Sequence, residues 1–130
     1  MNRLRNTTLS IALATSLVFG LVQTAAADTA GTFTGASDHV TTGGVTVVKN
    51  ADGTATVTLG ADFFLDGAPD PRIGFGANGS FVEGTDVGLL ESNTGSQTFT
   101  VPASINVDDF NEVYIWCLKF AVPLGVASLS

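Results

Sequence analysis

The chain has 130 residues, of which 12 are acidic and 5 basic, so its formal net charge is −7. Binding to nucleic acid or to anionic lipid requires a basic field, so neither function is expected of this chain. With 45% hydrophobic and 8% aromatic residues, the composition is typical of one packed domain and not of a disordered acidic tail.

The first 27 residues are typical of a secretory signal peptide. Arg3 and Arg5 precede an apolar run from Leu9 to Val22, and the small residues 25–27 follow it. A positive start, a short apolar middle and small residues at the cleavage point define such a segment. We predict cleavage after Ala27 and export to the periplasm or the extracellular space. An uncleaved membrane anchor is the alternative, although a span requires about 20 strongly apolar residues.

The predicted mature chain, residues 28–130, is expected to form a single β domain. It keeps three basic and twelve acidic residues, a charge of −9, and it has no apolar run longer than a strand, so no membrane span is expected after cleavage. Short segments with β-branched residues at period two alternate with Gly- and Asp-rich turns, which favours strands. The expected strands cover Gly31–Gly35, Val45–Val47, Val57–Leu59, Arg72–Gly76, Val87–Glu91, Ser96–Val101, Glu112–Leu118 and Phe120–Leu129.

These segments predict an all-β fold, a small antiparallel sandwich or barrel of about eight short strands. The turn residues 50–53 connect two alternating segments and predict a β-hairpin. Pro123 predicts an edge strand or a bulge, because proline cannot donate to a ladder. One helical turn is expected near 107–111, where Asp108 and Asp109 can open it.

Cys117 is the only cysteine, so an intramolecular disulfide is impossible. Strand alternation places Cys117 on one face with Val113 and Ile115, and places the other residues of the segment on the opposite face: Tyr114, Trp116 and Leu118. Both faces are apolar, which predicts a central strand with a buried thiol. Three roles stay open for this thiol: an inert core group, an intermolecular disulfide, or a reactive thiol or ligand.

His39 is the only histidine, which limits the metal and hydrolase chemistry of the chain. A Ser-His-Asp hydrolase has no supporting Gly-x-Ser-x-Gly turn, and a blue-copper site is excluded because it needs two histidines. A zinc site would have to join Cys117, His39 and distant carboxylates, and no ligand spacing supports it. Calcium binding by Asp62, Asp66 and Asp70 is a further hypothesis; in the alternative these aspartates form turns.

The mature chain resembles the DM13 domain family along nearly its whole length. The resemblance is carried by Gly31-Thr32-Phe33, His39, Gly44-Val45-Thr46-Val47, Phe63-Phe64-Leu65-Asp66-Gly67-Ala68-Pro69-Asp70, Gly95-Ser96-Gln97, Val101-Pro102, Phe110, Val113-Tyr114-Ile115-Trp116-Cys117, Phe120, Val122, Gly125, Ala127 and Leu129. The Asp-Gly-x-Pro-Asp turn and the Ile-Trp-Cys strand are its most specific parts.

The resemblance implies an extracellular all-β module whose single cysteine acts in redox chemistry or electron transfer, as a thiol or as the ligand of a prosthetic group such as haem. The redox role then falls on Cys117, with His39 as a second cofactor-binding candidate. No attachment motif identifies a cofactor, and a lone thiol cannot cycle through an internal disulfide. We therefore expect a redox or surface protein as partner in trans, and not a stand-alone enzyme. The alternative is a non-enzymatic binding or surface-assembly module in which Cys117 is a core residue.

Overall fold

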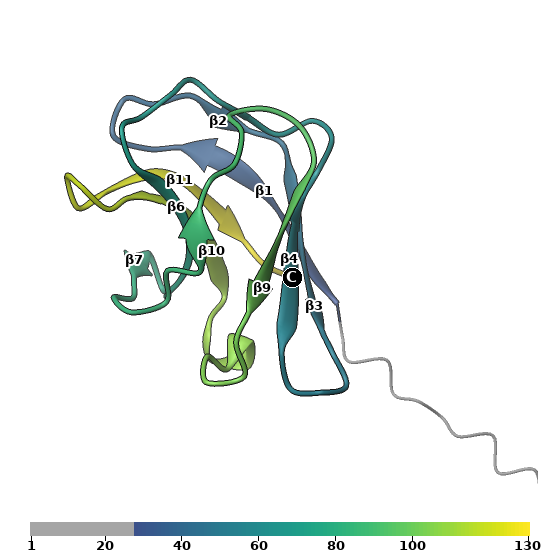
Figure 1. Cartoon of the computed structure of the whole chain (residues 1–130). Coiled ribbons are helices and arrows are strands. Elements are labelled where there is room, and N and C mark those ends of the chain that lie inside the picture. Colours follow the sequence, from purple (N-terminus) through teal and green to yellow (C-terminus); the bar gives the residue numbers. More distant parts are fainter. Residues whose placement is uncertain (1–27) are drawn as a thin grey trace, which may run out of the picture.

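The computed structural model describes residues 28–130, and the predicted signal peptide lies outside this range. Within this range the chain forms eleven strands and one turn of 3-10 helix, and all of the strand pairs are antiparallel (Figure 1). They are β1 (Thr29–Gly35), β2 (Thr41–Thr42), β3 (Gly44–Lys49), β4 (Ala55–Leu59), β5 (Phe64–Leu65), β6 (Pro71–Ala77), β7 (Ser80–Phe81), β8 (Gly88–Leu89), β9 (Gln97–Val101), η1 (Val107–Asp109), β10 (Glu112–Cys117) and β11 (Val122–Ser128). The predicted all-β antiparallel class is confirmed.

Nine of these strands form one sheet that curls into a half-barrel (Figure 1). Its order is β7-β6-β10-β11-β1-β3-β4-β9, with β8 paired to β6 beside this path, and β2 and β5 form a separate two-stranded sheet. The β3–β4 hairpin was predicted from its alternation, and its register pairs Val47 with Val57. Within the described residues, no helix is long and apolar enough to cross a membrane.

The strand boundaries differ from the prediction at several points. Three of the four two-residue strands, β2, β5 and β7, were not predicted, because two residues are too few to show alternation. The segment predicted as Val87–Glu91 pairs only through Gly88–Leu89. Leu118 and Phe120 lie outside the strands, in the turn between β10 and β11, where Ala121 has a left-handed φ of 52°.

Pro123 lies at a bulge, which was one of the two alternatives predicted for it. The register between β10 and β11 shifts between Ile115 and Trp116, which pair with Gly125 and Pro123. β11 as a whole is an inner strand between β10 and β1, but its pairing with β1 ends at Gly125, so Pro123 itself is paired only with β10. A bulge lets the sheet keep proline in an inner strand, since the ladder is locally interrupted there.

One hydrophobic core fills the concave side of the half-barrel. Alternate residues of the strands point into it, and the largest fully buried side chains are Phe63, Phe75, Leu59, Leu65, Ile73, Ile115 and Leu124. The predicted helical turn is present as η1, where the Asn106 side chain accepts a hydrogen bond from the Asp108 amide. This N-cap begins the only helical turn in the described residues.

Candidate functional site

Cys117 is the last residue of β10, a strand between β6 and β11. Its Cα is paired with Pro71 on one side and with Val122 on the other. Its side chain is 1% exposed and belongs to the hydrophobic core together with Val113 and Ile115. The predicted central strand with a buried thiol is therefore confirmed.

Directly after Cys117 the chain leaves the sheet through an exposed turn. Leu118 is 47% exposed and Phe120 61% exposed, although the Leu118 amide still donates to the Asp70 carbonyl at 3.1 Å. Ala121 closes the turn in the left-handed region, which costs a residue with a Cβ more than it costs glycine. The thiol is thus buried at a strand end, next to a segment with little buried apolar surface.

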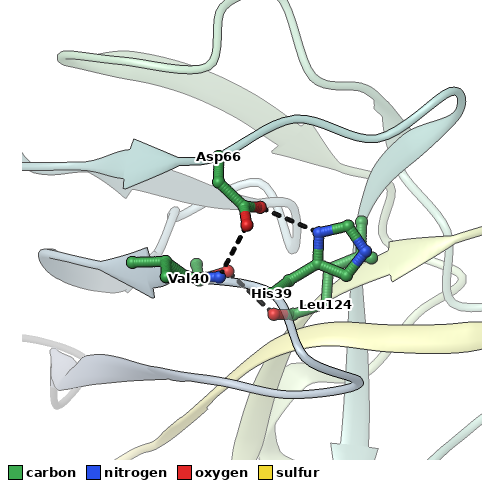
Figure 2. Close-up of polar contacts among 5 residues, drawn as sticks. His39, Val40, Asp66 and Leu124 are labelled. Atoms are coloured by element: carbon green, nitrogen blue, oxygen red, sulfur yellow. Dashed lines mark hydrogen bonds and ion pairs between the residues drawn. The ribbon is translucent and has the colours of Figure 1, made fainter.

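His39 lies in the loop between β1 and β2 and is held by a carboxylate from another loop. Its Nδ1 is 2.8 Å from Asp66 Oδ1, and the second carboxylate oxygen of Asp66 accepts the Val40 amide at 3.0 Å. Figure 2 shows the Asp66 carboxylate reaching both groups at once. The Asp66 amide in turn donates to the Val40 carbonyl at 3.0 Å. Asp66 thereby joins two loops that are 27 residues apart in sequence.

These hydrogen bonds stabilise the ionised form of Asp66. The Val40 amide and, to a lesser extent, the His39 ring stabilise the carboxylate, so the pKa of Asp66 lies below its usual value. An ionised carboxylate can only accept hydrogen bonds, so the hydrogen of this pair lies on His39 Nδ1. When the ring is neutral, the free lone pair therefore lies on the other nitrogen, Nε2.

The same loop is anchored to β11 through the backbone of Leu124. The Leu124 carbonyl accepts the hydroxyl of the buried Thr41 at 2.8 Å and the Ala36 amide at 3.0 Å. Gly125 has no room for a Cβ, which would stand 2.6 Å from Thr41 Cγ2. These contacts fix the start of the β2 segment, and with it His39, over the first half of β11.

His39 and Cys117 both lie near the end of the sheet where β11 begins, but the structure shows no polar contact between them in the described residues. His39 bonds to Asp66, whereas Cys117 faces the core. Both residues were candidates for cofactor binding, and the structure gives each of them a separate environment.

A haem does not fit at Cys117 in this arrangement. The sulfur is enclosed by the core, and strands flank the residue on both sides, so haem iron has no open approach to it. His39 has the orientation common in metal-binding histidines, with one nitrogen held by a carboxylate. Among residues 28–130, however, no three His, Cys, Asp or Glu side chains gather as a metal site would require.

The three aspartates of the calcium hypothesis have different partners. Asp62 accepts the Gly44 amide, Asp66 holds His39 and Val40, and Asp70 accepts from Arg72 Nε at 2.9 Å. Two of these carboxylates thus accept from backbone amides, but the amides lie 18 and 26 residues away in sequence, and Asp70 accepts from an arginine side chain. The local turn bonds of the alternative hypothesis are not the contacts that these three aspartates make.

Sequence reasoning did not identify the partner of His39 or the aromatic cluster on the outer face of β10. In that cluster the Trp116 and Phe81 rings are stacked with centroids 4.1 Å apart, and Tyr114 meets Phe81 edge-on at 5.7 Å. The Asp-Gly turn after Leu65 was a visible signal for Asp66. No local sequence signal predicts the contact of His39 with Asp66 or those of Phe81 with the rings on β10, because each contact joins segments far apart in sequence.

Comparison with protein families gives one match, to the family model described as Electron transfer DM13, over residues 32–129. Comparison with curated proteins and with solved structures gives no significant match. The matched range includes His39, Asp66 and Cys117, and it ends one residue after β11. The chain therefore belongs to the DM13 family, whose description is that of an electron-transfer domain.

Proposed function

We propose that this protein is an exported accessory module for redox or electron-transfer reactions, in which Cys117 is the redox group. Family membership supports the reaction class, and the signal-peptide pattern of residues 1–27 supports export. The module acts in trans on a redox or surface protein, because a single thiol cannot form an internal disulfide.

The position of Cys117 at the end of β10 carries the proposal. Strand ends and exposed turns open at a lower free energy than the middle of a core strand. The residues that follow Cys117 are exposed, and one of them has a left-handed backbone. A local opening of this turn exposes the sulfur while the rest of the sheet stays folded. The thiol is then buried in the closed state and accessible in the locally open, less populated state.

The chemistry in that minor state is a two-electron oxidation of sulfur. The Cys117 thiol reacts with a peroxide to give a sulfenic acid, and the peroxide leaves as water or an alcohol. A thiol of the partner then forms a mixed disulfide with Cys117 and releases water. A second thiol of the partner displaces the Cys117 thiolate, so the partner leaves as a disulfide and the module is reduced again.

Peroxide treatment of the purified protein tests this proposal. Sulfenic acid is trapped with a dione reagent and located by mass spectrometry, before and after addition of a dithiol. We expect trapping at Cys117 in the folded protein and its loss after the dithiol. The Cys117→Ala variant is the control and should show no adduct. Absence of any adduct in the folded protein, together with an adduct after denaturation, would contradict the proposal.

The second candidate function is a non-enzymatic extracellular binding or surface-assembly module. The 1% exposure of Cys117 within the core favours it, because a thiol buried among apolar groups is usually inert. In this case Cys117 contributes only to packing. The same trapping experiment separates the two functions, since a purely structural thiol reacts only when the whole domain unfolds.

A further inference from the structure

The outer face of β6 and β10 carries a built aromatic platform that the redox proposal does not use. A Cβ at Gly74 would stand 2.6 Å from Phe81 Cε2, and a Cβ at Gly76 would stand 2.3 Å from Tyr114 Cε2. The two glycines thus leave space for these rings close to the backbone of β6. Phe81 stacks on Trp116 at an interplanar angle of 9°.

Hydrogen bonds hold the loop after β7 beside this platform. The Thr85 hydroxyl accepts the Phe75 amide at 2.9 Å and lies 3.0 Å and 2.7 Å from the carbonyls of Phe75 and Val82. Thr85 itself is buried. Asp86 accepts the Gly88 amide at 2.9 Å. The loop is therefore positioned by defined hydrogen bonds.

A cleft of about 250 Å³ lies between this loop and the turn that follows β10. It is lined by Phe81, Glu83, Gly84, Asp86, Trp116, Leu118 and Ala121. Pockets for drug-sized molecules usually measure about 300–1,000 Å³, so this cleft suits one chemical group. Two aromatic rings and a leucine form its apolar walls, and two carboxylates are its charged groups.

The charges around the cleft leave a negative excess. Asp86 lies 3.8 Å from Arg72 Nη1, but Arg72 is shared with Asp70 at 2.9 Å. Within residues 28–130, Glu83 has no ion-pair partner and is exposed. Lys119 lies over the Phe120 ring at 5.5 Å and is not part of the cleft lining. An aromatic wall beside one unpaired carboxylate, and a second carboxylate that shares its arginine, attracts a cation through ring faces and charge.

We propose that this cleft binds an organic cation of the size of one quaternary ammonium or guanidinium group. The aromatic and leucine walls contact its apolar carbon atoms, and Glu83 and Asp86 balance its charge. The cation is either a small molecule or the arginine side chain of a basic partner, since both present the same delocalised or shielded charge. The site does not include Cys117, whose thiol faces the core on the opposite side of the strand. It does share Leu118 and Ala121 with the turn that follows Cys117.

Fluorescence of Trp116 provides the test, because it is the only tryptophan in the chain. One arm titrates choline and a second arm titrates a blocked Gly-Arg-Gly peptide; the uncharged analogue 3,3-dimethylbutan-1-ol is the control. We expect a saturable emission change with the cations, weakened by salt, and little change with the alcohol. Tighter binding of choline identifies a small molecule as the ligand, and tighter binding of the peptide identifies a side chain of a partner.

Two matched variants complete the experiment. Glu83→Gln should weaken binding about two- to fivefold, which is the effect expected from the loss of one solvent-exposed ion pair. Glu91→Gln changes an exposed glutamate outside the cleft and should leave the affinity unchanged. Absence of saturation in both arms, equal binding of the alcohol, or equal weakening by the two variants would overturn the proposal.

Discussion

Asp66 shows how one side chain can join loops that the sequence keeps far apart. Its carboxylate accepts hydrogen bonds from the His39 ring and the Val40 amide, and its own amide bonds back to Val40. The three contacts hold the β1–β2 loop against the segment before β6. The stabilising effect of the two side-chain contacts depends on the ionised carboxylate, because only that form accepts both hydrogen bonds.

This dependence predicts how stability changes with pH. The pKa of Asp66 is lowered in the fold, whereas an unfolded aspartate titrates near ~3.9. The stabilisation is therefore complete above the unfolded pKa and is lost as the pH falls through the folded pKa. We expect Asp66→Asn to lower the melting temperature at pH 7, with a gap to the wild type that shrinks below about pH 4.

Thermal unfolding followed by circular dichroism between pH 7 and pH 3 measures this gap. The pKa of Asp52 is also lowered, chiefly by its hydrogen bond to the Thr54 side chain, but this residue titrates equally in both proteins and cancels in the difference. Asp109→Asn, at an exposed carboxylate, serves as the control and should show no such pH dependence. A constant gap for Asp66→Asn at all pH values would contradict the assigned role.

The buried position of Cys117 predicts a second result at the residue scale. Serine would place a hydroxyl among the apolar neighbours of Cys117, and an unsatisfied polar group costs about 1–3 kcal/mol. Alanine adds no polar group and leaves only a small cavity. In urea unfolding we expect Cys117→Ser to be less stable than Cys117→Ala. Equal stability of Cys117→Ser and the wild type would mean that this position is not a dry core.

At the scale of elements, the strands with regular alternation were predictable and the short ones were not. The β3–β4 hairpin has β-branched residues at period two and a short connection at residues 50–54, so local sequence determines it. In β6, by contrast, Gly74 and Gly76 carry no strand signal of their own. They are needed because rings from Phe81 and Tyr114 cover them, and those contacts arise only in the folded sheet.

The loop after β7 depends on a single hydroxyl. Thr85→Val keeps the shape of the side chain but removes the acceptor for the Phe75 amide. A buried amide without a partner costs about 1–3 kcal/mol, and the loop should loosen. We expect this loss in urea unfolding, together with weaker cation binding in the cleft. An unchanged free energy of unfolding would show that water replaces the hydroxyl at this point.

At the scale of the whole molecule, the family and the all-β class could be predicted because the matching motifs extend along nearly the whole mature chain. The pairing of His39 with Asp66 could not, because it depends on how distant loops meet. The predicted mature chain has twelve acidic and only three basic residues. Such an excess of one sign attracts basic partners and repels acidic ones, which agrees with a cation-binding cleft.

The most direct test of the central claim is the alkylation rate of Cys117 at increasing urea concentrations below the unfolding transition. A local opening of the β10–β11 turn exposes little surface, so we expect a measurable rate that is nearly independent of urea. Ala121→Gly relieves the left-handed strain of the turn and should slow the labelling. A rate that follows global unfolding from the lowest urea concentration, in both proteins, would contradict a redox role for Cys117.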